Sequence, residues 1–276
     1  MPAQAMHNQH FANLSPKNEA TARSANHRLK MLSYNIQTGI DTRAYRGYVT
    51  GGWKHVLPHV GRVQNLRRIA DVVAEYDFVA LQEIDSGSIR SGFLNQVEYL
   101  AERAQFPYWH TQINRDLGML AQHGNGLLSR VSPEQMEDHR LPGVIPGRGA
   151  ILVRLPFAGR SLVVVMLHLS LGTRSREKQL EYVAQCVADE ELVVVMGDMN
   201  CHAQELLTQS PLAALNLMSV EDSQPTFPAW QPQVALDHIL VSPGLTMCDY
   251  EVLDCHLSDH LPIGLTVGLA EQTVAA

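Results

Sequence analysis

The stretch Leu192-Val193-Val194-Val195-Met196-Gly197-Asp198-Met199-Asn200 contains both signals that decide the fold of this chain. Its first five residues are apolar, and three of them are consecutive valines. Such a continuous run is typical of a strand that is covered on both faces. A carboxylate and a carboxamide follow directly after it. The stretch therefore predicts a buried strand that ends in polar side chains, at the sheet edge where open α/β structures commonly bind ligands.

The same arrangement of apolar run and turn recurs along the chain. Strand-like apolar runs occupy residues 29–36, 78–84, 126–129, 150–155, 161–169, 192–196, 236–241 and 263–269. Apolar residues with helical spacing and similar signals predict helices near residues 66–73, 96–104, 180–187 and 204–215. Some strands are close enough for hairpins and others are separated by a helix. We therefore expect mixed β-sheets with helices outside.

Composition and charge bound the class of protein. The chain has 276 residues, of which 45% are hydrophobic and 18% charged, as in ordinary globular proteins. We expect residues 28–270 to form one domain, preceded by a flexible arm over 1–27 and followed by a tail over 271–276. The net charge of −7 argues against a tight nonspecific nucleic-acid binder, because such binding scales with Lys and Arg contacts to phosphate. It does not exclude nucleic acid.

The lack of recognisable targeting signals predicts a cytoplasmic location. The first 30 residues contain no apolar leader, and the longest apolar runs are too short to span a bilayer. The four cysteines form no C-x-x-C pair, so free thiols in a reducing compartment are expected. No membrane insertion and no protein partner are implied.

Polar residues collect where the apolar runs end. Asn35, Glu83 and His168 each follow or close such a run, and Asp237-His238 and Asp259-His260 directly precede one. A single Asp or Asn at this place is more often a turn residue or a helix cap. Glu83 is harder to explain in that way, because a carboxylate at the end of so apolar a strand needs a partner. Together with Asp198 and Asn200, these residues favour one shared site.

In their order, these segments resemble the motifs of the endonuclease/exonuclease/phosphatase superfamily. The matching motifs are Ser33-Tyr34-Asn35-Ile36, Leu81-Gln82-Glu83-Ile84-Asp85, Gly126-Leu127-Leu128-Ser129-Arg130, Leu167-His168-Leu169, Gly197-Asp198-Met199-Asn200, Leu236-Asp237-His238-Ile239 and Ser258-Asp259-His260-Leu261-Pro262. The superfamily includes DNase I, exonuclease III-type repair nucleases, inositol-polyphosphate 5-phosphatases and neutral sphingomyelinases. The resemblance covers about residues 29–269. It implies an α/β (α+β) fold, a DNase I-like four-layer sandwich of two face-to-face mixed β-sheets flanked by helices.

The resemblance also implies a divalent-metal site. Glu83 would bind Mg²⁺ or Mn²⁺, with Asn35 beside it contacting a metal-bound water or the phosphate. Asp259 would be a second-site or outer metal ligand. Carboxylate and carboxamide oxygens are the hard ligands that these ions prefer.

Catalytic roles are implied for five further residues. Asp198 would align and help deprotonate the attacking water, and Asn200 would hold a phosphate oxygen. His168 would stabilise the charge that develops on the phosphoryl group or assist the leaving oxygen. Asp237 would fix the tautomer of His260, whose other nitrogen would face the phosphate.

The sequence departs from the family pattern at two points. The extra carboxylate that orients the histidine corresponding to His168 in DNase I-like relatives has no counterpart that we can place. The acidic residue that follows the first Asn in exonuclease III-type enzymes is missing unless Asp41 substitutes for it. Asp85 is expected to cap a helix or form a turn, while Arg148 is either a phosphate clamp or a solvated loop charge.

Residues 43–62 contain interleaved aromatic and basic side chains, next to the sheet edge where the site residues are expected. They either contact substrate, by stacking a base or gripping a phosphate, or form a packed insertion.

The leading hypothesis is a divalent-metal-dependent phosphoesterase that uses in-line attack by an activated water. A DNA or RNA nuclease of the same superfamily is the first alternative, and a non-enzymatic binding module is the second. The partner is expected to be a phosphoester substrate, namely a nucleic acid, a nucleotide or a small phosphate ester. Fold and catalytic residues define the reaction and not the substrate.

Overall fold

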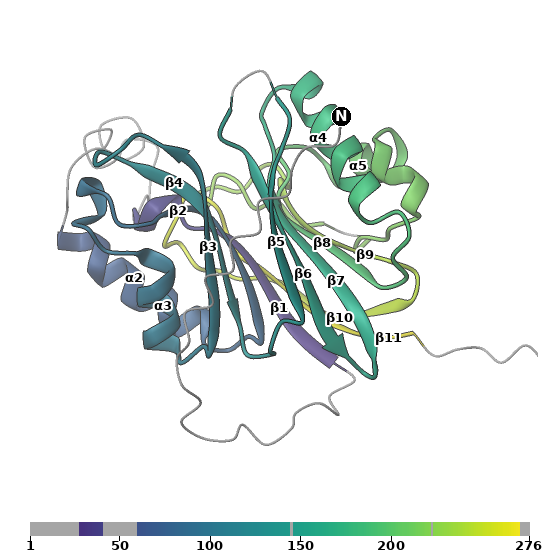
Figure 1. The fold of residues 1–276 in the computed structure, drawn as a ribbon, viewed down its shortest axis with the longest axis horizontal. Coiled ribbons are helices and arrows are strands. Elements are labelled where there is room, and N and C mark those ends of the chain that lie inside the picture. The colour runs from purple at the N-terminus through teal and green to yellow at the C-terminus, as the bar shows by residue number, and fades with distance from the viewer. Residues whose placement is uncertain (1–27, 41–59, 144–145, 222, 271–276) are drawn as a thin grey trace, which may run out of the picture.

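Two β-sheets pack face to face in the computed structural model, which describes residues 28–40, 60–143, 146–221 and 223–270 (Figure 1). The six-stranded sheet has the order β10-β11-β1-β2-β4-β3 and the five-stranded sheet has the order β5-β6-β7-β8-β9. The first sheet comprises β1 (Arg28–Asn35), β2 (Phe78–Asp85), β3 (Tyr108–Asp116), β4 (Gln122–Ser129), β10 (Leu245–Val252) and β11 (Ile263–Leu269). The second sheet comprises β5 (Gln135–Arg140), β6 (Gly149–Phe157), β7 (Arg160–His168), β8 (Val193–Asp198) and β9 (Asp237–Val241).

Helices cover the outer face of each sheet. Helices α2 (Val60–Val73) and α3 (Gln96–Ala104) lie on the first sheet, and α4 (Thr173–Cys186) and α5 (Ala203–Thr208) lie on the second (Figure 1). Three apolar clusters follow from this layering, one between the sheets and one beneath each helical layer. The predicted four-layer sandwich of mixed sheets is confirmed.

The continuous valine runs have the predicted environment. Val194 of β8 packs between the sheets, whereas Val193 and Val195 pack under the helical layer, and all three are almost fully buried. A strand buried on both faces has no need of polar residues until it reaches the sheet edge. This explains why the polar residues are concentrated at the strand ends.

Some elements differ from the prediction. The helix expected over 204–215 is broken, because α5 ends at Thr208 and a separate 3₁₀ helix spans Pro211–Leu215. Pro211 cannot continue the preceding helix, and the Ser210 hydroxyl accepts a hydrogen bond from the Leu212 N–H at the new start. Strands β3, β5 and β10 were not predicted. All three contain exposed and half-buried residues and lack a continuous apolar run.

Several sequence predictions lie outside the described residues. These are the arm over 1–27, the tail over 271–276, Asp41, and the part of segment 43–62 up to residue 59. Arg62 belongs to α2, is buried, and donates to the carbonyl oxygen of Arg90. All four cysteines are free thiols, as expected.

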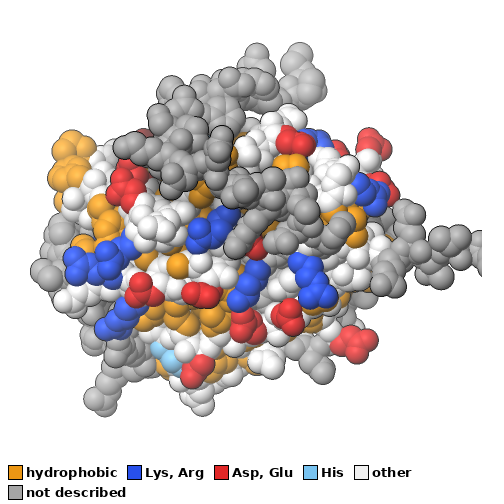
Figure 2. Space-filling view, turned by 90° about the horizontal axis from the view of Figure 1, so that it is seen from below, with side chains coloured by type: hydrophobic (Ala, Val, Ile, Leu, Met, Phe, Trp, Pro, Cys, Tyr) orange, Lys and Arg blue, Asp and Glu red, His pale blue; other side chains and the backbone are white. Residues whose placement is uncertain are grey.

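The surface carries charges of both signs. On the face shown in Figure 2, the Lys and Arg side chains are interspersed with Asp and Glu. No helix among the described residues is long and apolar enough to cross a membrane.

A buried ion pair closes the loop that follows β2. The Asp85 carboxylate accepts hydrogen bonds from the backbone N–H groups of Gly87 and Ser88, from the hydroxyls of Ser88 and Ser91, and from the Arg90 guanidinium. Burial alone would raise the pKa of Asp85, but the donors of Ser88, Arg90 and Gly87 outweigh it and lower the pKa to about 2. The turn role expected for Asp85 is confirmed.

We predict that Asp85→Asn lowers the free energy of unfolding by about 3–5 kcal/mol, because Arg90 then remains buried without its counter-charge. Urea denaturation measures this loss, and Glu102→Gln on the exposed face of α3 is the matched control. The folded-state pKa of Asp85 is depressed, so its contribution is present above pH 4 and is lost as the pH falls towards 2. A pH-independent difference between wild type and Asp85→Asn across this window would contradict the assignment.

Candidate functional site

Three neighbouring strands of the second sheet place His168, Asp198 and Asp237 in one row. His168 at the end of β7 pairs with Asp198 at the end of β8, and Asp198 pairs with Asp237 at the start of β9. Residues that are paired in this way project from the same face of the sheet. The row is therefore a direct product of the strand register.

Close contact between β7 and β8 requires Gly197. Its φ of +144° is unfavourable for other residues, and an added Cβ would overlap the backbone carbonyl of Leu167. The glycine before Asp198 thus lets the two strand ends approach. This explains the first residue of the Gly197-Asp198-Met199-Asn200 motif.

The first sheet contributes Asn35 and Glu83 through an irregularity in β2. Ala80 faces the other sheet, whereas Leu81 and Ile84 both face the helices. In a regular strand, one residue separates two neighbours that face the same side, but here two residues separate Leu81 from Ile84. Glu83 has a φ of +55°, and the β2–β4 register shifts here. The bulge turns the Glu83 carboxylate toward Asn35, whose Nδ2 donates to Glu83 Oε1 at 3.2 Å.

The carboxylate of Asp198 lies where the two sheets meet. Its Oδ2 accepts from Asn35 Nδ2 at 3.1 Å and lies 3.3 Å from His168 Nε2 and 3.8 Å from His260 Nε2. Burial raises the pKa of Asp198 to about 7, although the nearby charge of His260 opposes this. A carboxylate with a pKa close to 7 is suited to accept a proton from water. Asn200 adjoins it, with a backbone N–H that donates to Asp198 Oδ1 and a side chain that donates to the Leu169 carbonyl.

His260 is held by Asp237. Its Nδ1 lies 2.8 Å from Asp237 Oδ2, which also accepts from the Thr226 hydroxyl, and the Phe227 ring packs 4.8 Å from the imidazole. Burial lowers the pKa of His260, but Asp237 and Asp198 more than offset this and raise it to about 10. The imidazole is therefore a cation near neutral pH, with Nε2 directed at Asp198.

His168 has the opposite protonation. Burial holds its pKa well below the usual range, and the positive charges of Arg148 and His260 lower it further. One histidine of the site is therefore neutral and the other charged, which gives them different chemical capacities.

Asn35, Glu83 and Asp259 form a second group of oxygen donors. Asp259 Oδ2 accepts from Gln37 Nε2 at 2.9 Å, and the Gln37 N–H donates to Asn35 Oδ1 at 3.1 Å. Burial raises the pKa of Asp259 to about 6, and the charge of Glu83 adds to this. A buried carboxylate that is destabilised by a second negative charge fits a divalent cation, which would compensate that charge.

A different trio also has metal-like spacing. Donor atoms of Asp198, Asp237 and His260 all lie within 4.8 Å of one another. Nδ1 of His260 is nevertheless already bonded to Asp237, and the raised pKa of His260 favours the protonated form, which offers a metal no free electron pair. The fit to a cation is therefore better at Glu83, Asn35 and Asp259.

Arg148 lies at the same edge. Gly149, the next residue, starts β6, and the pairing of Ala150 with Leu167 brings this start to the end of β7, close enough for the Arg148 charge to act on His168. Burial lowers the pKa of Arg148, while the negative charges of Glu83 and Asp198 raise it. The structure thus brings all nine predicted residues together: Asn35, Glu83, Arg148, His168, Asp198, Asn200, Asp237, Asp259 and His260.

Some residues of the site were not predicted. Gln37, Thr226 and Phe227 contact Asp259, Asp237 and His260, respectively. Gln37 lies two residues after Asn35, but in a 3₁₀ turn over Gln37–Gly39 that strand alternation does not predict. Thr226 and Phe227 lie in a loop without periodic pattern, and no sequence signal identified them.

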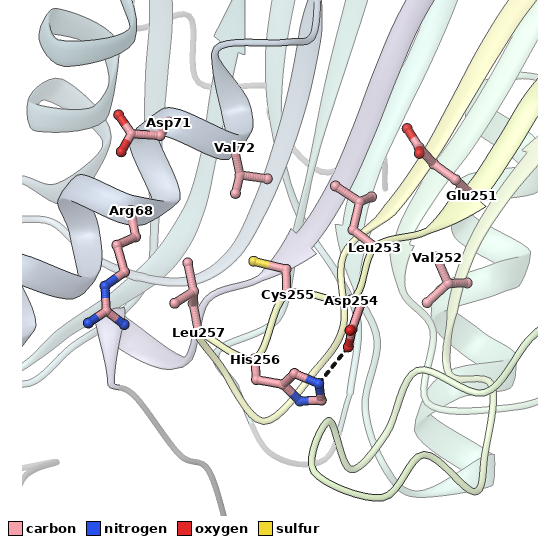
Figure 3. A pocket seen from close by; sticks show the side chains of 10 residues that line it. All are labelled: Arg68, Asp71, Val72, Glu251, Val252, Leu253, Asp254, Cys255, His256 and Leu257. Atoms are coloured by element: carbon pink, nitrogen blue, oxygen red, sulfur yellow. Dashed lines mark hydrogen bonds and ion pairs between the residues drawn. The ribbon is translucent and has the colours of Figure 1, made fainter.

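A hollow of about 680 Å³ lies elsewhere, between α2 and the chain leaving β10 (Figure 3). Its lining combines Arg68 and Asp71 of α2 with residues 251–257, and Asp254 and His256 form a hydrogen bond of 2.6 Å across its rim. None of the nine predicted site residues lines it. The hollow and the candidate site are separate features.

Comparison with known proteins agrees with this arrangement. The sequence profile of the Endonuclease/Exonuclease/phosphatase family matches residues 32–260. The uncharacterized protein YbhP of Escherichia coli K12 is 26% identical over 259 residues, which cover 87% of this chain and 96% of YbhP.

Solved structures share the fold. An endonuclease/exonuclease/phosphatase from Beutenbergia cavernae superposes with a TM-score of 0.70 at 22% identity, over 90% of this chain and 73% of that one. A complex of D. rerio TDP2 with single-strand DNA product gives a TM-score of 0.63 at 21% identity, over 87% and 99% of the two chains. The family includes nucleases and phosphatases. With a family profile that spans most of its length, this chain belongs to the Endonuclease/Exonuclease/phosphatase family.

Proposed function

We propose that the protein hydrolyses phosphate esters by in-line attack of a water molecule, with a divalent cation held by Glu83, Asn35 and Asp259. The observation that carries the proposal is the environment of the Asp198 carboxylate. It is buried, has a pKa raised to about 7, and lies between the oxygen donors of the first sheet and the two histidines. A general base with such a pKa is efficient near neutral pH.

The cation is assigned to the side of the site that carries Glu83. Bound there, Mg²⁺ or Mn²⁺ supplies positive charge to the phosphoryl oxygens. Asn35 and Glu83 are already joined by a hydrogen bond, and Gln37 links Asn35 to Asp259. The three ligands are thus positioned by contacts within the chain.

The remaining residues handle protons and orient the phosphoryl group. Asp198 takes a proton from the attacking water as the new P–O bond forms and the bond to the leaving oxygen breaks. The His260 cation, kept protonated by Asp237, faces the negative charge of the transition state. Neutral His168 donates a hydrogen bond to the phosphoryl group or the leaving oxygen, and Asn200 and Arg148 bind phosphoryl oxygens.

We predict that wild-type protein hydrolyses bis-p-nitrophenyl phosphate in the presence of Mg²⁺ or Mn²⁺. Asp198→Asn should lower kcat by about 10²–10⁴-fold, because the amide cannot accept the proton of the water. The exposed Asp189→Asn is the matched control and should retain wild-type activity. Inactivity of the wild type on a broad phosphoester panel with both metals would refute the enzymatic proposal and favour a binding module.

Metal binding provides a test that does not depend on turnover. Glu83→Gln should weaken Mn²⁺ binding by at least about tenfold, because it removes the charge of the principal ligand. Electron paramagnetic resonance of free Mn²⁺ measures the dissociation constant directly. Unchanged affinity in Glu83→Gln would place the cation elsewhere, for example at Asp198 and Asp237.

The substrate class separates a nuclease from a phosphatase. The DNA complex of D. rerio TDP2 favours nucleic acid, whereas the net charge of −7 argues against a long polyanion. We expect kcat/KM on small phosphate esters and nucleotides to exceed that on polymeric DNA or RNA. A panel of single- and double-stranded DNA, RNA, nucleotides and sugar or inositol phosphates decides this. Preferential cleavage of a polymer would make the protein a nuclease.

A further inference from the structure

Two buried amide side chains connect the two sheets just below the candidate site. Gln112 of β3 and Asn125 of β4 are cross-strand partners in the first sheet, and both are almost fully buried. Neither touches the proposed metal ligands or the catalytic histidines through a hydrogen bond between side chains. They reach instead to the backbone of β6 in the second sheet.

This pair donates hydrogen bonds to the backbone carbonyls of the first residues of β6. Gln112 Nε2 donates to the Ala150 carbonyl at 2.9 Å and to the His139 carbonyl at 3.2 Å. Asn125 Nδ2 donates to the Gly149 carbonyl at 3.0 Å and to Gln112 Oε1 at 3.2 Å. Two consecutive carbonyls of β6 are thus held by two neighbouring side chains of the other sheet.

The network has only one consistent orientation. Carbonyl oxygens only accept, so Gln112 must present its amide nitrogen to them, which turns its oxygen toward Asn125. Asn125 must then donate both to that oxygen and to the Gly149 carbonyl. Reversal of either amide would place oxygen against oxygen in a buried environment, at a cost of about 1–3 kcal/mol for each unpaired group.

Gly149 allows this close approach. A Cβ at this position would overlap Asn114 Oδ1 and Gln112 Oε1. Only a residue without a side chain lets β6 lie against the amides of the first sheet. The glycine is therefore explained by the contact between the sheets.

The two peptide groups held by these amides directly follow Arg148 in the chain. Gly149 follows it, and the Arg148 carbonyl accepts from the Leu141 N–H at 3.1 Å, so the backbone is held on both sides. The pairing of Ala150 with Leu167 brings this start of β6 to the end of β7, close enough for the Arg148 charge to act on His168. The guanidinium then faces Glu83 and Asp198, one from each sheet.

We propose that Gln112 and Asn125 are positioning residues for Arg148. They hold the start of β6 in the position from which the Arg148 guanidinium can bind the phosphoryl group of the substrate. The inference rests on the proposed function in one respect, namely that the ligand of Arg148 is a phosphate. The positioning role itself does not depend on the proposed function. It states that Arg148 is held in place by the other sheet, through two amides that do not contact the substrate.

The test compares phosphate binding in Asn125→Ala, Arg148→Ala and the double variant. Isothermal titration calorimetry with inorganic phosphate in the presence of Mg²⁺ gives the dissociation constants. Arg148→Ala should weaken binding by about 10–100-fold, because a charge-assisted hydrogen bond is lost. Asn125→Ala should lose a similar factor, and the double variant should be no weaker than Arg148→Ala.

A general loss of stability is distinguished by controls. Thr111→Val, next to Gln112 on β3, removes a hydroxyl that has no hydrogen-bond partner among the described residues and should keep wild-type phosphate affinity. Should Asn125→Ala not fold, Gln112→Ala removes the other half of the bridge and is compared in the same way. Wild-type affinity in the bridge variant, or losses that multiply in the double variant, would overturn the inference.

Failure of the two proposals can be told apart. Wild-type protein that binds phosphate and hydrolyses no ester would refute the proposed function while leaving the bridge testable by affinity alone. Protein that hydrolyses esters normally in both Asn125→Ala and Gln112→Ala, with unchanged KM and kcat, would refute only the bridge. Wild-type protein that binds no phosphate would overturn the ligand assigned to Arg148 and this inference with it.

Discussion

Burial of several negative charges at one edge of the sandwich is the constraint to which the rest of the site responds. Glu83, Asp198, Asp237 and Asp259 approach one another from both sheets, and the last three are almost fully excluded from water. Isolated carboxylates in such a position would be costly. His260, Arg148 and the amides of Asn35 and Gln37 provide part of the compensation. A bound cation would provide more.

Two buried carboxylates of this chain show how the environment separates structural from chemical roles. Asp85 receives donors from four residues, and its pKa falls to about 2, so it remains an ion that only holds a loop. Asp198 has fewer donors and lies near other carboxylates, and its pKa rises to about 7. Burial raises the pKa of both carboxyl groups, but only Asp85 has enough donors, Arg90 among them, to outweigh it.

The sequence predicted the architecture and the residues that the structure brings together at the site better than the residues that support them. Valine-rich runs such as that of β8 identify strands buried on both faces, so the polar residues after them were conspicuous. Strand β5, which is half exposed, has no such signal, and the helix over 204–215 was overextended because its apolar spacing continues past Pro211. Gln112 was not predicted, because its partners in the second sheet are backbone carbonyls, which leave no trace in side-chain identity.

The strand order also has a consequence for the time course of folding. Asn35 and Asp198 are 163 residues apart in the chain, and Gln37 and Asp259 are 222 apart. Contacts between such distant residues require closure of long loops, which slows folding, and no contiguous half of the polypeptide contains both members of these pairs. During synthesis the emerging chain cannot complete the site until the segment that carries Asp259 and His260 has left the ribosome. The complete site is therefore expected to arise late, and a chain that ends before Asp259 lacks His260 and one of the proposed metal ligands.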